Sequence, residues 1–166
     1  MSKIHRLAGV SLATVLACGL ATTANAQLLQ HKDLSSAIAT TIALTAVDAC
    51  KQAGYNVSVH VVGRNGEVLV GLRHHAAGVN TFENSWKKAY TSRTFRIASG
   101  KFAENVGQNP VAGQLFLANI TAARGALPIM IGEETIGAVG VSGAPGGDKD
   151  EVCAQAGIDK VKDQLR

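Results

Sequence analysis

Three consecutive residues, Arg73, His74 and His75, carry side chains that are well suited to hold a ligand. They lie where a predicted strand ends and a loop begins, a position at which binding residues are common. An imidazole can ligate a metal ion or a haem iron, and a guanidinium can hold a carboxylate such as a haem propionate. Because successive strand residues point to opposite faces, we do not expect both histidines to ligate one ion. The alternative is that they are solvated polar residues at the start of a loop.

A second group of candidates lies in residues 87–90, within a predicted helix. Lys88 could hold an acidic group of a ligand, and the oxygen of Tyr90 could ligate a haem iron. The same segment also fits an amphipathic helix in which Phe82, Trp86 and Tyr90 form an apolar stripe and the lysines reach solvent. Periodicity alone favours this second interpretation.

A glycine-rich segment, residues 140–148, precedes the last predicted helix. Free backbone N–H groups at a helix start can bind an anion. Asp148 argues against phosphate, because its own carboxylate would take these donors, and the segment lacks the Lys-Ser/Thr ending of a P-loop. Gly137, Gly140 and Gly143 recur every three residues and so alternate between the two faces of a strand, which indicates close backbone packing. The sequence shows no arrangement of a nucleophile with a base.

Hydrophobic periodicity and turn signals predict the elements that position these residues. Helical spacing predicts three helices, over residues 34–53, 80–98 and 148–164. Apolar runs bounded by turn residues predict five strands, over residues 57–61, 67–73, 115–120, 127–131 and 135–141. Asp33 and Asn80 are placed to cap the first two helices, and Asn65-Gly66 marks a hairpin turn. Residues 101–113 are expected to form an irregular connection.

This order of elements predicts an α+β fold. Hairpin-length connections between neighbouring strands favour an antiparallel sheet, which the helices would cover. We therefore expect a five-stranded antiparallel sheet with the element order α-β-β-α-β-β-β-α. Residues 27–166 are enough to form one domain with a substantial core.

The first 26 residues have the pattern of a secretory signal peptide. Lys3 and Arg6 precede an apolar run over residues 7–20, and Ala24-Asn25-Ala26 supplies a small-x-small cleavage site. The run of about 14 residues is shorter than the roughly 20 that a helix needs to span a bilayer. We expect cleavage after Ala26, a periplasmic or secreted location, and no stable membrane span. Lipidation at Cys18 is an alternative.

Removal of the signal peptide changes the charge and cysteine balance. The full sequence holds 16 basic and 12 acidic residues, and the peptide removes two basic residues and no acidic one. The mature chain is therefore close to neutral and has no electrostatic reason to bind nucleic acid. Cys50 and Cys153 remain, and they can form a disulfide in an oxidising compartment or stay as buried thiols. No C-x-x-C motif is present for zinc, thiol redox chemistry or covalent haem attachment.

Three segments resemble one known family. Residues 136–157, IGAVGVSGAPGGDKDEVCAQAG, are similar to the C-terminal signature of the GlcG/HbpS family. Residues 88–91 followed by Phe95 resemble the motif of its middle helix, and residues 126–129 resemble its G-x-P-[IL] strand. The resemblance covers nearly all of residues 28–165 in order.

The resemblance implies a small α+β protein that binds haem without a covalent bond, in some members degrades it, and forms homo-oligomers. Related domains occur in PduO-type corrinoid adenosyltransferases, and one exported relative senses haem or redox stress with a membrane sensor kinase. The family often has Arg-x-Asp-Gly-Ala after the second strand, whereas this chain has RHHAAG from Arg73. Arg73 matches the pattern and the Asp does not, which directs attention to His74 and His75 as iron ligands.

We therefore expect an exported haem-binding protein that degrades haem or serves as a haem- or redox-sensing accessory. Arg73, His74 and His75 are the expected haem contacts, with one histidine on the iron, and Lys88 and Tyr90 are secondary contacts. One alternative is a non-haem accessory protein that binds a small carboxylic acid or a partner protein. Another is an enzyme that acts on a small organic acid.

Overall fold

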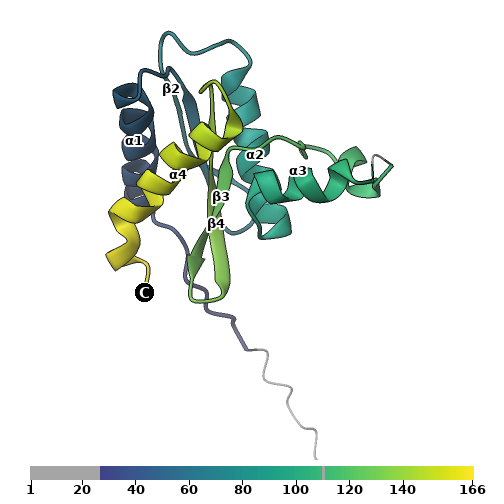
Figure 1. The fold of residues 1–166 in the computed structure, drawn as a ribbon. Helices are drawn as coiled ribbons and strands as arrows, with labels where there is room; N and C mark the ends of the chain where they lie inside the picture. The colour runs from purple at the N-terminus through teal and green to yellow at the C-terminus, as the bar shows by residue number, and fades with distance from the viewer. Residues whose placement is uncertain (1–26, 110) are drawn as a thin grey trace, which may run out of the picture. The chain divides into compact units, whose positions relative to one another are not determined.

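The computed structural model describes residues 27–109 and 111–166, and the chain divides into two units, Met1–Gln30 and His31–Arg166. In the first unit, residues 27–30 are exposed and form no regular secondary structure. The predicted signal peptide, residues 1–26, lies outside the described residues. All described helices and strands belong to the second unit (Figure 1). Among the described residues, no helix combines the length and apolar character needed to cross a membrane.

The second unit is built on a four-stranded antiparallel sheet with the order β2-β1-β4-β3. Its strands are β1 (Ser58–Val62), β2 (Val68–Arg73), β3 (Ala126–Ile131) and β4 (Glu134–Ser142). The predicted first hairpin is confirmed, with Gly66 in its turn at a φ of 81° that favours glycine. Strands β1 and β4 pair in the middle of the sheet, where Val59 faces Val141, and this pairing joins the two hairpins.

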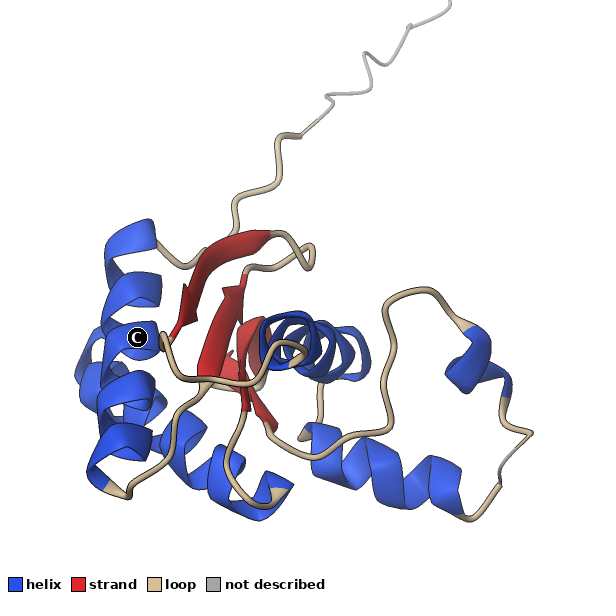
Figure 2. Cartoon of the chain, turned by 90° about the horizontal axis from the view of Figure 1, so that it is seen from above, coloured by secondary structure: helices blue, strands red, loops and turns tan. Residues whose placement is uncertain are grey.

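Helices cover both faces of the sheet (Figure 2). Helices α1 (Ser36–Gln52) and α4 (Gly147–Val161) lie on one face, and α2 (Thr81–Phe95) lies on the other. Helix α2 lies very close to β4 at Gly140. A Cβ added to this glycine would be only 2.2 Å from the carbonyl oxygen of Ser85. The expectation that these glycines serve close backbone packing is confirmed at Gly140.

The alternation of residues along β1 explains why both faces are covered. Val59 and Val61 belong to the main apolar core with residues of α1 and α4 such as Ile42. Ser58 and His60 point to the α2 face, where each hydrogen-bonds a side chain of that helix. All five residues of β1 are buried, so the central strand has an apolar face and a polar face that are both shielded from water.

Cys50 on α1 and Cys153 on α4 form a disulfide, with their Cα atoms 5.5 Å apart. The structure thus contains the pairing that the sequence allowed. Helices α1 and α4 also pack closely at Gly157, where an added Cβ would be 2.6 Å from the carbonyl oxygen of Ile42. The first and last helices of the chain therefore form one layer, joined by the disulfide.

The predicted strand over residues 115–120 is wrong, so the sheet has four strands and not five. This stretch starts inside a short 3-10 helix, η1 (Gly113–Phe116), and continues as turns. Asn119 has a φ of 67°, which an extended strand does not tolerate. The apolar side chains of Leu115 and Ile120 pack on a small separate cluster around Phe102 instead of entering the sheet.

The predicted helix over residues 80–98 is also corrected, because α2 ends at Phe95. Arg96 adopts the left-handed conformation with φ 59° and breaks the helix. A separate helix, α3 (Ser99–Gly107), then occupies part of the expected irregular segment and extends beyond α2, away from the sheet (Figures 1 and 2). The observed order is therefore α-β-β-α-α-β-β-α, with η1 between α3 and β3 and a short η2 (Lys162–Gln164) at the end.

The predicted helix caps differ as well. Ser35, not Asp33, caps α1, since its hydroxyl accepts the Ile38 N–H at 3.2 Å. The side chain of Asn80 forms no capping hydrogen bond to α2. Helix α4 has Gly146 at its cap position, and Asp148 lies in its first turn.

Candidate functional site

Arg73, His74 and His75 lie at the edge of the sheet, where β2 ends. The chain leaves the strand here, and the His74 N–H still donates to the Val57 carbonyl at 3.0 Å. One terminal nitrogen of Arg73 donates to the Ala77 carbonyl, which closes the loop. The two imidazole rings lie with their centroids 4.2 Å apart, because strand alternation stops at Arg73. The structure therefore brings the two histidines side by side.

The two histidines differ in how free their ring nitrogens are. His74 Nδ1 accepts the Ala76 N–H at 3.2 Å, so the proton of the neutral ring lies on Nε2. Partial burial, followed by the nearby His75 and Lys51, lowers the pKa of His74. His75 is exposed, and its ring forms no hydrogen bond with the described residues. His75 is thus the more accessible ligand of the pair.

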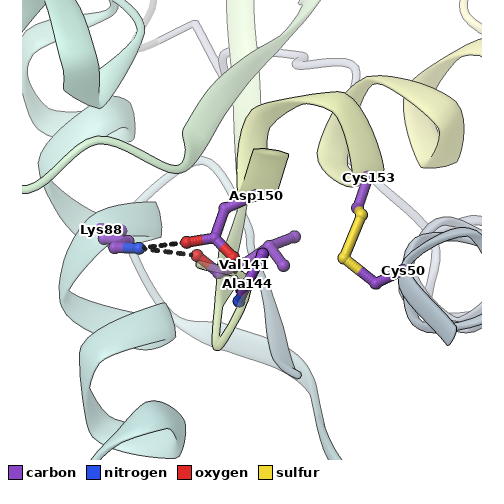
Figure 3. Close-up of a disulfide and its surroundings, with 6 residues drawn as sticks. All are labelled: Cys50, Lys88, Val141, Ala144, Asp150 and Cys153. Carbon is purple, nitrogen blue, oxygen red and sulfur yellow. Dashed lines mark hydrogen bonds and ion pairs between the residues drawn. A yellow bond between two sulfur atoms is a disulfide. The ribbon is translucent and has the colours of Figure 1, made fainter. Parts of the chain in front are cut away.

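The ammonium group of Lys88 already forms hydrogen bonds within the protein (Figure 3). Its ammonium donates to Asp150 Oδ2 at 2.8 Å and to the Val141 carbonyl at 3.0 Å. The lysine and aspartate side chains are only 5% and 3% exposed. The other oxygen of Asp150 accepts the Ala144 N–H at 3.0 Å, so this ion pair connects α2, the end of β4 and the first turn of α4.

Burial raises the pKa of Asp150, and the hydrogen bond and charge of Lys88 oppose that rise. Lys88 and the Ala144 N–H thus replace the water that would otherwise solvate this carboxylate. Because Lys88 and Asp150 satisfy each other inside the protein, the structure gives Lys88 a role in joining elements.

Tyr90 lies at the opposite end of β2 from the histidine pair. Its ring packs over the hairpin turn, where a Cβ on Gly66 would be 2.7 Å from a ring carbon. The Trp86 ring is 6.2 Å away, between centroids. Since β2 separates this turn from Arg73, Tyr90 and the histidine pair are not brought together within one subunit.

His60 is a core residue. It is 4% exposed, its Nδ1 is 2.8 Å from the Ser85 hydroxyl, and its ring contacts Phe82 edge to face at 4.3 Å. Burial lowers the pKa of His60 to about 4, so the ring is neutral at physiological pH. Its place on the polar face of β1 is set by the alternation of that strand.

Two hollows lie near the C-terminal end of α2. One, of about 330 Å³, has a mixed apolar and amide lining and is formed with α3 and the segment after it. It is lined by Phe95, Ile97, Phe102, Asn105, Val106, Asn109, Ala112 and Gln114. Phe95 and Phe102 stack here at 4.4 Å between centroids. This hollow could not be predicted from the sequence, because residues 101–113 were expected to form an irregular connection and not part of a helix.

The second hollow, of about 420 Å³, is charged and is lined by Arg64, Arg93, Arg96, Glu133, Glu134 and Thr135. The three arginines come from the first hairpin turn and from the end of α2, and the other residues come from the second hairpin. No motif links these distant positions in the sequence. Across residues 27–109 and 111–166, no group of three or more His, Cys, Asp or Glu side chains is arranged to hold a metal ion.

These features define an α+β protein with a two-hairpin antiparallel sheet, two helices on one face and one on the other, and a histidine pair at the sheet edge. The chain matches the family model described as haem degrading protein HbpS-like over residues 34–159. It therefore belongs to the HbpS-like family. A comparison with curated proteins finds no significant match.

Solved structures agree with this assignment. A crystal structure of HbpS is 33% identical, with a TM-score of 0.77, over 81% of this chain and 94% of that one. A double mutant of HbpS from Streptomyces reticuli is 30% identical, with a TM-score of 0.78, over 93% and 99% of the two chains. A crystal structure described as a PduOC–haem complex shares the fold, with 23% identity and a TM-score of 0.69 over 76% and 93%. The family resemblance predicted from the sequence is confirmed.

Proposed function

We propose that this protein is an exported protein that binds haem reversibly and without a covalent bond. The observation that carries the proposal is membership in a family described as haem-degrading, over residues 34–159. A similar fold occurs in a structure described as a haem complex, which supports haem as the ligand. Bound haem would supply a redox-active iron, and the protein would supply the axial ligand and the contacts to the propionates.

The residues at the end of β2 suit both tasks. His75 is exposed and its ring is free of hydrogen bonds to the described residues, so its lone pair is available to an iron. Arg73 is also exposed, and it uses one of its five N–H donors on Ala77, which leaves others for a carboxylate. His74 is the second candidate, but ligation through Nε2 would require its Nδ1 to give up the Ala76 N–H.

Export and assembly are part of the proposal. A disulfide between Cys50 and Cys153 is consistent with a periplasmic or secreted location after cleavage behind Ala26. Exposed apolar side chains around η1, with Phe116 77% and Leu117 54% exposed, support a homo-oligomer that covers them. Within such an assembly the protein would degrade haem or report haem or redox stress to a membrane sensor protein.

The decisive experiment is a haem titration followed in the Soret region. Wild type should give a saturable spectral change. His75→Ala should weaken it or alter the iron coordination, and His74→Ala and Tyr90→Phe should change it less. His31→Ala is the matched control, because His31 is an exposed histidine in the segment before α1.

Two outcomes would count against the proposal at different levels. No saturable change with wild type would exclude haem binding. Binding that is identical in His74→Ala, His75→Ala and His31→Ala would retain the function and reject the site at β2, and the hollow lined by Phe95 and Phe102 would then be tested next. For export, mass spectrometry of periplasmic material should give an N-terminus at Gln27.

A further inference from the structure

The charged hollow at the end of α2 has features of a binding site that are independent of the haem proposal. It lies between the two hairpin turns and α2, and it places three guanidinium groups around about 420 Å³ of space. Two of its side chains, Glu133 and Glu134, are acidic. Which charges are already neutralised decides what such a hollow can bind.

Arg64 is fully engaged. Its Nε donates to Asp33 at 2.7 Å and one terminal nitrogen donates to Glu134 at 2.6 Å. The other terminal nitrogen donates to the Lys32 carbonyl. The charge of Arg64 is therefore shared by two carboxylates, Asp33 and Glu134, and these three side chains form a fixed wall of the hollow.

Arg93 and Arg96 are not compensated in this way. The Nε of Arg93 is buried and has no hydrogen-bond partner among the described residues. Burial lowers the pKa of Arg93, and the nearby Arg96 and Arg64 lower it further. Arg96 has the left-handed conformation that ends α2, and its side chain forms no ion pair with the described residues. Neither guanidinium group is therefore paired with a carboxylate of the described residues, although both arginines line the hollow.

Glu133 gives the hollow a second recognition element. It is exposed in the turn between β3 and β4 and forms no ion pair with the described part of the chain. A polyanion such as phosphate would be repelled by the carboxylates of Glu133 and Glu134. A single carboxylate can instead accept paired N–H groups from the arginines while a donor group next to it reaches Glu133.

We propose that this hollow binds a small carboxylic acid that carries a hydroxyl or amino group on the carbon beside its carboxyl group. The carboxylate accepts hydrogen bonds from the terminal guanidinium nitrogens of Arg93 and Arg96. The hydroxyl or ammonium group donates to Glu133. Arg64 holds the wall against which the ligand lies.

Isothermal titration calorimetry of the purified, haem-free protein tests this with four probes. They are L-lactate, L-alanine, propionate and inorganic phosphate. Lactate or alanine should bind about fivefold or more tightly than propionate, which lacks the donor group. Phosphate should bind more weakly than both.

Substitutions locate the binding. Arg96→Gln, an exposed position that folding should tolerate, should weaken the preferred acid about tenfold or more, and Arg93→Gln should do the same. Glu133→Gln should reduce the preference over propionate. Arg124→Gln is the control, because Arg124 is an exposed arginine already paired with Glu104 at 2.8 Å, and it should leave binding unchanged.

Three results would overturn the inference. The first is no binding of lactate or alanine up to about 10 mM, a Kd range weaker than a built site should give. The second is equal binding of phosphate, which would indicate a nonspecific cationic surface. The third is an Arg96→Gln protein that binds like Arg124→Gln. None of these depends on whether the protein binds haem.

Discussion

Replacing Lys88 with methionine should destabilise the protein strongly. Methionine keeps the length and approximate volume of the lysine side chain but removes its charge. Asp150, whose side chain is 3% exposed, would lose the ammonium 2.8 Å away, and the Val141 carbonyl would lose its donor at 3.0 Å. Leaving one charge of a buried pair without its partner costs about 3–5 kcal/mol. We expect a loss of that size in the free energy of unfolding.

The neighbouring lysine provides a matched control. Lys87 forms an exposed i,i+4 pair with Glu83, and its side chain is 35% exposed. Exposed pairs of this kind contribute about 0.3–0.5 kcal/mol, so Lys87→Met should cost no more than that. The two variants make the same chemical change one residue apart, and they separate the effect of burial from the effect of losing a lysine.

The assay is urea unfolding at pH 7, followed by circular dichroism under oxidising conditions. A double variant, Lys88→Met with Asp150→Leu, should recover much of the loss, because it removes both charges and leaves no buried ion. Equal stability of Lys88→Met and Lys87→Met would refute this reasoning.

The same variant should also respond to pH. Burial already raises the pKa of Asp150, and removing Lys88 takes away the charge that opposes this rise. An acid whose pKa is higher in the folded state destabilises the fold as pH rises from its unfolded pKa, near 4, through its folded pKa. Lys88→Met should therefore be least destabilised at about pH 4 and progressively more so above it.

Three further predictions concern single features of the fold. Replacing both bonded cysteines with alanine should lower the free energy of unfolding by about 2–4 kcal/mol in denaturant melts, and reductant should then have no further effect. Gly140→Ala should lower the free energy of unfolding by about 2 kcal/mol or more, because the new methyl group would lie 2.2 Å from the Ser85 carbonyl oxygen. The control is Gly107→Ala, which has open space around it and should be neutral or stabilising. Equal costs in the two variants would contradict the close packing of α2 on β4. Burial lowers the pKa of His60 from 6.5 to about 4, so the unfolded chain binds the proton more readily than the folded protein does. As the pH falls from 6.5 to about 4, the free energy of unfolding should therefore decrease by up to about 3 kcal/mol. An NMR titration of the His60 ring with an ordinary pKa would contradict this last prediction.

Sequence periodicity identified the elements whose residues alternate or repeat cleanly. The valines of β1 and the Asn65-Gly66 turn predicted the first hairpin, which the structure contains. The family signature over residues 136–157 likewise falls on β4 and α4. In these segments local propensity and tertiary packing favour the same structure.

The secondary structure predicted for the region after α2 was wrong for an identifiable physical reason. Arg96 is a strong helix former, but it adopts the left-handed conformation and ends the helix, so the break could not be read from its residue type. The apolar residues of 115–120 looked like a strand because such runs suit any buried surface, and here the surface is the cluster around Phe102.

Candidate residues were recognised by type, but their partners were not. Lys88 was predicted to contact a ligand, whereas it forms an ion pair with Asp150, which lies 62 positions further along the chain. Arg64 and Arg93 meet in one hollow although a strand and most of a helix separate them in sequence. Such convergence depends on the whole fold, and a single sequence contains no signal for it.

The central pairing of β1 with β4 determines when this protein can fold. Val59 gains its neighbour Val141 and the cover of α4 only after nearly the whole chain has left the ribosome. Contacts between sequence-distant segments form slowly, because the loop between them must close first. The growing chain therefore has no complete core during synthesis, and cotranslational folding of an N-terminal portion is disfavoured. A polypeptide that has to pass a translocation channel in an unfolded form would benefit from this delay.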